Sequence, residues 1–196
     1  MPRKNFRQAR QIPVATGRGR STERLVGLRM IGRHTVSWLH VSVIAPLPDE
    51  FFMREALRQA QKAYAADEVP IGAVVMREGK IIARAHNQVE LLKDATAHAE
   101  MLALTAAEEA VGDWRLTDCD LYVTKEPCPM CAGALVHTRI RRVIFGCADL
   151  AAGAAGSMMN LLEMPGLNHQ CEITSGVLQK QCAVLLQDFF RKRRES

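Results

Sequence analysis

Two short segments hold the side chains that could do chemistry. The first is His98-Ala99-Glu100 and the second is Cys128-Pro129-Met130-Cys131. Each alone is a weak signal, because His-x-Glu is common by chance and Cys-x-x-Cys can be a zinc knuckle, a redox pair or two buried thiols. Together, one imidazole and two thiolates supply three ligands for tetrahedral zinc and leave a fourth position for water. The combination therefore predicts a catalytic zinc site.

The cysteine pair carries its own local structure. Pro129 suits the first position of a helix, which makes Cys128 the cap and places Cys131 in the first turn. Both sulfurs can then face one ion. The positive end of the helix dipole also favours a thiolate over a thiol, so the pair is suited to ligate a metal at neutral pH.

His98 and Glu100 impose a stricter condition. Side chains two residues apart point roughly 200° apart around a helix, so these two converge only at a helix end. We therefore expect a helix to begin near Ala97, with its N-terminus toward the metal.

Glu100 has a use in hydrolysis if it does not ligate the metal. Zinc lowers the pKa of its bound water to about 7, and the proton that leaves this water has to be delivered. A carboxylate can accept it, pass it to a ring nitrogen of a substrate and help protonate a departing amine. Taken alone, Glu100 is more simply a first-turn acid that complements the helix dipole. Beside His98 and the cysteine pair, it predicts hydrolytic deamination.

The elements that position these side chains alternate between helix and strand. Pro48 and Asp49 predict a helix start with Asp49 as its N-cap. Apolar periodicity and turn residues then predict, in order, a helix at 49–64, strands at 71–76 and 80–85 around a Glu78-Gly79 turn, a helix at 97–111, a strand at 121–124, a helix from Cys128, a strand at 142–145, a short helical piece at 158–163 and a last helix at 177–194. This order predicts a three-layer α/β fold with a mixed sheet.

Residues 1–48 differ from the rest in composition. Residues 1–46 carry nine Arg or Lys and one acid, a net charge of +8, whereas residues 47–196 carry 17 bases and 20 acids, a net charge of −3. The segment shows no helical or strand periodicity, so we expect a basic arm with little structure ahead of one domain at 49–196. A targeting peptide, an RNA-binding polycation and translation upstream of the functional start all remain open.

Composition restricts the class of protein. A chain of 196 residues with 48% apolar and 24% charged residues is typical of a soluble globular protein, and no apolar run is long enough to span a membrane. Six cysteines are too few for a disulfide scaffold, which favours a reducing, cytoplasmic location. We interpret the four outside the motif as free thiols: Cys119, Cys147, Cys171 and Cys182. His137 is not expected to be a fourth metal ligand.

The two chemical segments resemble the zinc nucleoside and nucleobase deaminases, in which a glutamate that is not a ligand accompanies a His/Cys/Cys zinc site. Over residues 50–194 the chain is more specifically similar to the bacterial tRNA-specific adenosine deaminases. The segments that carry this similarity are Val69–Val74, Thr96–Glu100, Cys131–Ala134, His137–Ile140, Gly153–Ser157 and Asp188–Arg191.

The resemblance implies a cytidine-deaminase-like α/β/α fold with a mixed five-stranded sheet. It also implies one Zn²⁺ per subunit, a homodimer, and a tRNA anticodon stem-loop whose wobble adenosine becomes inosine. No further protein partner and no membrane are expected. A single-stranded anticodon loop suits such a reaction, because extruding one base from it costs less than opening a duplex.

The resemblance also assigns roles by position. His98, Cys128 and Cys131 would bind zinc, and Glu100 would be catalytic. Asn87, Val69 and Ala99 would contact the base, while the Asp149 carboxylate would accept a hydrogen bond from a 2′-hydroxyl. The RNA-binding residues would be Arg191, Arg193 and Arg194.

Two departures and two alternatives stay open. Lys125 replaces a commonly apolar residue of the family and Val89 a common proline, which leaves pocket shape and loop rigidity undecided. A zinc deaminase of free cytidine, deoxycytidylate or guanine is the nearer alternative, against which stand the basic last helix and Asp149. A non-enzymatic zinc module that binds RNA is more distant, because a structural site normally has four protein ligands. The tRNA isoacceptor is not specified.

Overall fold

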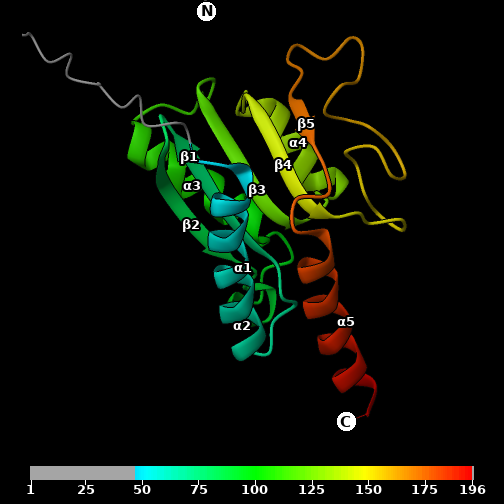
Figure 1. Cartoon of the computed structure of the whole chain (residues 1–196). Helices are drawn as coiled ribbons and strands as arrows, with labels where there is room; N and C mark the ends of the chain where they lie inside the picture. The colour runs from blue at the N-terminus through cyan, green and yellow to red at the C-terminus, as the bar shows by residue number, and fades with distance from the viewer. Residues whose placement is uncertain (1–46, 196) are drawn as a thin grey trace, which may run out of the picture. The chain divides into compact units, whose positions relative to one another are not determined.

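The computed structural model of the protein describes residues 47–195, which are built around one five-stranded sheet (Figure 1). The strands are β1 (Gly72–Arg77), β2 (Lys80–His86), β3 (Cys119–Lys125), β4 (Arg142–Cys147) and β5 (Glu172–Thr174). Their spatial order is β2-β1-β3-β4-β5. β1 runs antiparallel to β2 and β3, whereas β3, β4 and β5 are parallel. The predicted mixed sheet is confirmed, and residues 1–46 of the predicted basic arm lie outside the described residues.

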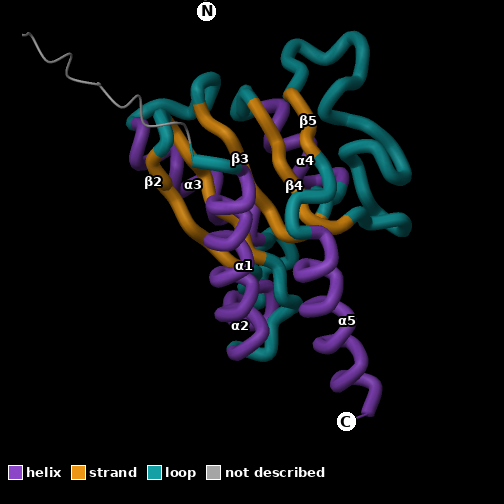
Figure 2. Tube along the Cα trace, viewed as in Figure 1, coloured by secondary structure: helices purple, strands orange, loops and turns teal. Residues whose placement is uncertain are grey.

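Helices cover both faces of this sheet (Figure 2). They are α1 (Asp49–Ala65), α2 (Val89–Leu92), α3 (Ala99–Val111), α4 (Pro129–His137) and α5 (Gln179–Glu195). Successive residues of β3 alternate between the layers: Leu121 and Val123 pack with residues of α3 and α4, and Tyr122 packs with residues of α1 and α5. The molecule therefore has the predicted α/β/α layers.

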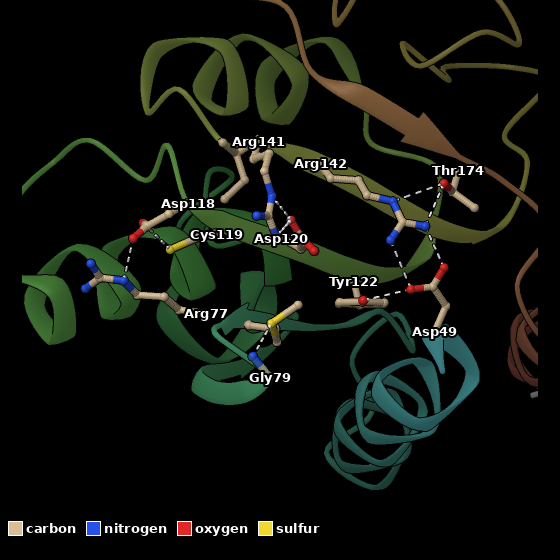
Figure 3. Close-up of polar contacts among 12 residues, drawn as sticks. Asp49, Arg77, Gly79, Asp118, Cys119, Asp120, Tyr122, Arg141, Arg142 and Thr174 are labelled. Carbon is tan, nitrogen blue, oxygen red and sulfur yellow. Dashed lines mark hydrogen bonds and ion pairs between the residues drawn. The ribbon is translucent and has the colours of Figure 1, made fainter. Parts of the chain in front are cut away.

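Asp49 has a different role from the predicted one. Pro48 is the N-cap of α1, and Asp49 is the first residue of the helix. Its carboxylate accepts a hydrogen bond from the Tyr122 hydroxyl at 2.9 Å and pairs with the Arg142 guanidinium at 2.5 Å (Figure 3). The prediction of an Asp49 cap was wrong because a half-buried arginine and a buried tyrosine compete for the carboxylate more strongly than the helix terminus does.

The long loop between β4 and β5 also differs from expectation. No helix forms at 158–163; the backbone N–H groups of Met158 and Met159 both donate to the carbonyl of Gly153 at 3.2 Å, and Ala155 forms an isolated bridge with Asn160. These hydrogen bonds replace those of a helix. The sequence also contained no signal for β5, since three residues are too few to show an alternating pattern.

None of the helices in residues 47–195 is long and apolar enough to cross a membrane.

Two glycines fix the hairpin on which the site depends. Gly72 begins β1 directly under α1, where an added Cβ would lie 2.1 Å from the Ala56 carbonyl oxygen and 2.3 Å from the Ala60 nitrogen. Gly79 lies in the β1–β2 turn at φ +76°, following Glu78 at φ 51°, and no atom lies within 4 Å of its Cβ position.

Substituting the two glycines by alanine should separate steric from conformational cost. Gly72→Ala should lower the free energy of unfolding by about 3 kcal/mol or more, because the new methyl group meets helix backbone that cannot yield. Gly79→Ala should cost only about 1 kcal/mol, because the penalty is left-handed backbone strain alone. Urea denaturation of the two variants measures both, and equal losses would contradict the close approach of α1 and β1.

Candidate active site

Two helices begin at the same point of the molecule. His98 is the N-cap of α3, and Cys128 is the N-cap of α4, with Pro129 in the first helical position. Cys131 follows in the first turn of α4. The predicted placement of Cys128 and Pro129 is confirmed, and α3 starts two residues later than expected, so that His98 precedes the helix and Glu100 lies in its first turn. This is the arrangement in which residues two apart can face one centre.

The three candidate ligands meet. The Nδ1 atom of His98 lies 3.7 Å from the Cys128 sulfur and 3.5 Å from the Cys131 sulfur. All three ligand atoms lie within 4.8 Å of one another. A tetrahedral zinc ion with ordinary bond lengths separates its nitrogen and sulfur ligands by about 3.6 Å. The geometry of the donor set therefore fits a metal ion of this kind.

The electrostatics of the cysteine pair favour one thiolate. Hydrogen bonds from Cys131 and His98 lower the pKa of the Cys128 thiol. The bond to Cys128, together with burial, raises the pKa of Cys131. The bond with Cys128 raises the pKa of His98. The protonation of each of these three groups thus depends on the other two. A divalent cation would compete with the protons for all three ligand atoms.

Glu100 lies beside this donor set. Its side chain is 3% exposed, and its Oε2 atom has no hydrogen-bond partner among residues 47–195. Burial raises the pKa of the carboxyl group, opposed by a backbone hydrogen bond and the charge of His98. A buried carboxylate oxygen without a hydrogen-bond partner destabilises the fold unless a bound group interacts with it. Its position and its raised pKa suit a proton carrier at a metal centre.

Glu126, two residues before Cys128, organises the loop after β4. The buried Glu126 carboxylate accepts N–H groups of Asp149 at 2.9 Å and of Ala155 and Ser157, each at 3.0 Å, and also the Ser157 hydroxyl. Burial opposes the charge of Glu126, but these bonds outweigh it and lower its pKa. Gly153 is required here, because a Cβ would lie 2.4 Å from the carboxylate. Glu126 thus holds residues 149–157 next to Cys128.

Asp149 is already engaged within the chain. Its Oδ2 atom pairs with Lys125 Nζ at 2.6 Å, and its Oδ1 atom accepts the N–H groups of Ala151 at 3.1 Å and Ala152 at 3.3 Å. Burial opposes its charge, and the bond from Lys125 outweighs this and lowers its pKa. The uncommon lysine at position 125 therefore acts on the one residue that was expected to meet a 2′-hydroxyl.

Of the residues expected to contact the base, Asn87 and Val69 precede His98 in the sequence and Ala99 follows it directly. Asn87 follows β2, and the next residue, Gln88, donates its N–H to the carbonyl of Ala97 at 3.0 Å. The Asn87 side chain donates to the buried Glu68 carboxylate at 3.1 Å. Ala99 is fully buried at the start of α3. The structure thus brings Asn87 close to the turn that carries His98.

Val69 and the end of α5 share a cavity. It has a volume of about 190 Å³ and is lined by Asp67, Val69, Glu90, Phe189, Phe190 and Arg193. Arg193 pairs with the Asp67 carboxylate at 2.9 Å, and Arg191 pairs with Asp188. Arg194 is exposed on the same last turns of α5. Of the three predicted RNA-binding arginines, Arg193 is the one that the structure brings beside a predicted base-contacting residue.

The structure also places the remaining residues that the sequence singled out, and it reveals two that the sequence did not. All six cysteines are free, and His137 ends α4, outside the group that could hold a metal among the described residues. Val89 begins the short helix α2 instead of a proline-stiffened loop. Sequence reasoning missed Glu68 and Glu126. Both are buried carboxylates, and only a buried position distinguishes them from surface acids.

Comparisons with known proteins agree on one family. A family model described as MafB19-like deaminase matches residues 48–194. The tRNA-specific adenosine deaminase of Bacillus subtilis (strain 168) is 51% identical over 147 residues, which cover 75% of this chain and 91% of that protein. A structure from a study of A-to-I editing by tRNA:A34 deaminases at the wobble position of transfer RNA shares 43% identity at a TM-score of 0.67, covering 69% of this chain and 99% of that one.

A more distant structural neighbour shares the fold at a lower sequence identity. The guanine deaminase from Nitrosomonas europaea shares 26% identity at a TM-score of 0.63, over 71% of this chain and 83% of that one. It has the same architecture but little more than half of the identity found above. On its sequence as well as on its fold, the chain belongs to the tRNA-specific adenosine deaminase family.

Proposed function

We propose that the protein converts adenosine to inosine at the wobble position of a tRNA anticodon, as a zinc-dependent hydrolase. The observation that carries this proposal is the meeting of His98, Cys128 and Cys131 beside the buried, unpartnered Oε2 atom of Glu100, in a chain of the tRNA-specific adenosine deaminase family. A deaminase needs a held nucleophile and a proton carrier next to it, and these residues supply both sites.

The chain's own residues divide the work between them. His98, Cys128 and Cys131 would hold the zinc ion, which lowers the pKa of a water ligand to about 7 and so supplies a nucleophile at neutral pH. Glu100 accepts a proton from the attacking water at Oε2 and delivers a proton to N1 of the adenine ring. Glu100 then takes the second proton from the new hydroxyl on C6 and transfers it to the amine, the C6–N bond breaks, and ammonia leaves while C6 keeps the oxygen as a carbonyl. The raised pKa of Glu100 suits it to both steps.

The substrate side is assigned to three groups of residues. We assign Asn87, Val69 and Ala99 to the contact with the base, and we assign Asp149, in the loop that Glu126 holds, to the contact with the ribose. The end of α5, with Arg191, Arg193 and Arg194, attracts the phosphates of the anticodon stem. The partner is therefore a tRNA anticodon stem-loop, whose unpaired bases can leave the stack at low cost.

The assembly and location follow the family. We infer one zinc ion in each subunit of a homodimer that works in the cytoplasm. Six free cysteines support a reducing compartment, in which thiols persist as metal ligands. Leu150 lies in the loop of residues 149–157 and Met158 directly follows it, and these side chains are 86% and 62% exposed. Such exposure of apolar residues supports a subunit contact there.

A deaminase of a free nucleobase is the second candidate, supported by the shared fold of the guanine deaminase. An adenosine-at-wobble hairpin, incubated with the protein and sequenced for inosine, separates the two. Free guanine, cytidine and deoxycytidylate, assayed in parallel for ammonia release, serve as the comparison. Deamination of a free base or nucleoside without editing of the hairpin would refute the tRNA proposal.

Glu100→Gln should abolish turnover and leave the metal in place. The amide keeps the shape of the side chain but cannot accept the proton, so hairpin editing should fall by at least about 100-fold. Zinc content, measured by atomic absorption, should match the wild type. Glu109→Gln removes an exposed acid from the same helix and is the matched control. Retained editing in the Glu100 variant would point to a zinc module without this chemistry.

Removing the metal should inactivate the protein reversibly. Dialysis against a strong chelator should abolish hairpin editing, and one equivalent of zinc should restore it. Cys131→Ala should not recover under the same zinc addition, because it removes one of the three candidate ligands that residues 47–195 bring together. Full editing activity after complete loss of zinc would contradict the metal-dependent reaction.

Asp149→Asn should reduce the preference for RNA over DNA. The amide can still accept a hydrogen bond from a 2′-hydroxyl but lacks the charge that strengthens this bond by about 1 kcal/mol, so the ratio of rates on RNA and DNA hairpins should fall about fivefold. Lys125→Met is the matched control, because it removes the cation paired with Asp149 and keeps the carboxylate. The same ratio in Asp149→Asn as in the wild type would exclude this role of the side chain.

A further inference from the structure

A second buried carboxylate lies outside the metal centre. Glu68 is 1% exposed and stands just before Val69 and Pro70, between α1 and β1. Each of its two oxygens accepts one hydrogen bond. The backbone N–H of Leu91 donates to Oε1 at 2.7 Å, and the side-chain amide of Asn87 donates to Oε2 at 3.1 Å.

These two bonds determine which way the Asn87 amide faces. Both carboxylate oxygens of Glu68 act as acceptors here, so the NH₂ group of Asn87 points at Glu68. The amide is planar, and its Oδ1 atom therefore points to the other side. Asn87 is only 4% exposed, and no donor of residues 47–195 bonds to Oδ1. Oδ1 does not belong to the fully buried side-chain atoms that lack a partner, so the atom is accessible, and a ligand with a donor group can bond to it.

The backbone around Asn87 is bonded to the segment that carries His98. Two backbone bonds of 3.0 Å fix this stretch, from Asn87 to the carbonyl of Ile71 and from Gln88 to the carbonyl of Ala97, the residue before His98. On the other side, Val69 follows Glu68 and lines the cavity shared with α5. The Asn87 amide is thus held between the segment of the metal ligand His98 and that of Val69.

We propose that Glu68 is a positioning residue that turns the Asn87 carbonyl oxygen toward the substrate, so that the pocket offers a hydrogen-bond acceptor there. This inference rests on the proposed function and adds the polarity of one contact to it. The matching group on an adenosine is an N–H of the exocyclic amine or a ribose hydroxyl. A substrate that presents an acceptor at this point would leave two oxygens facing each other and is rejected.

Glu68→Gln tests the polarity while keeping the number of hydrogen bonds. The Leu91 N–H can only donate, so it holds the carbonyl oxygen of the new amide. The NH₂ group of that amide then faces Asn87, whose own amide has to turn over to accept it. The pocket now presents N–H where it presented oxygen. A purely structural Glu68 would leave catalysis unchanged, because every bond is replaced.

We expect E68Q to lower kcat/KM on the anticodon hairpin by roughly 10- to 100-fold, mainly through KM. Its zinc content and its Tm should match those of the wild type and of the control Glu109→Gln. In the double variant E68Q/N87D the new amide donates to one carboxylate oxygen at position 87, and the other oxygen again faces the substrate. The double variant should recover at least tenfold over E68Q, whereas N87D alone sets two carboxylates against each other and should stay weak.

A second readout does not depend on activity. In the wild type the side-chain N–H protons of Asn87 face the buried Glu68 and should exchange slowly with water in ¹⁵N NMR spectra. In E68Q they face the pocket and should exchange at least tenfold faster. Unchanged exchange, unchanged kcat/KM in E68Q, or a double variant no better than E68Q would each overturn the proposal.

The controls keep this inference separate from the proposed function. If the wild type does not edit the hairpin, the proposed function fails, and the proton-exchange readout still tests the orientation of Asn87. A hairpin with 2′-deoxyadenosine at the target identifies the donor. The E68Q penalty disappears on it if the donor is the 2′-hydroxyl and persists if the donor is the amine.

Discussion

The constraint on which this structure depends is that two helix N-termini meet at one point. α3 and α4 follow different strands, yet His98 and Cys128 are the N-caps of these helices, and their ligand atoms lie 3.7 Å apart. Two sulfurs and a buried carboxylate so close together repel one another when ionised. The positive ends of both helix dipoles offset part of this cost, and a divalent cation would offset the rest. The same convergence that makes the arrangement costly without a cation gives it the donor set that a metal ion needs.

Around this centre, loops are held by buried acceptors more than by regular secondary structure. Glu126 binds the backbone of residues 149–157, and Glu68 binds the backbone of Leu91 together with the Asn87 side chain. A carboxylate can accept from several N–H groups at once, which lets one residue fix a whole turn. Glu126 directly follows β3 and Glu68 precedes β1. The rigid sheet therefore fixes the positions of both acids, and the acids fix the loops that flank the candidate site.

The sequence predicted what is local and missed what is distant. Cap chemistry placed Cys128 and Pro129 correctly because the signal lies within one helix turn. The hairpin turn at Gly79 was equally local. Asp49 was assigned wrongly because its partners, Tyr122 and Arg142, lie 73 and 93 residues away in sequence. The burial of Glu68 and Glu126 was missed for the same reason: a single sequence does not show which acids become buried among the N–H groups of another segment.

The arginines at the end of α5 remain available to an anionic ligand although they form ion pairs within the chain. Arg191 pairs with Asp188 and Arg193 with Asp67, and both guanidinium groups are exposed, by 62% and 48%. Exposed ion pairs are worth only about 0–1 kcal/mol, so a phosphate can replace the acid at little cost. Until then the pair holds the guanidinium in one place, which lowers the entropy lost on binding. The stacking of the Arg193 guanidinium on Phe189, 5.3 Å from the ring centre, adds to this restraint. For the proposed contact with RNA, paired arginines are thus better ordered in advance than free ones.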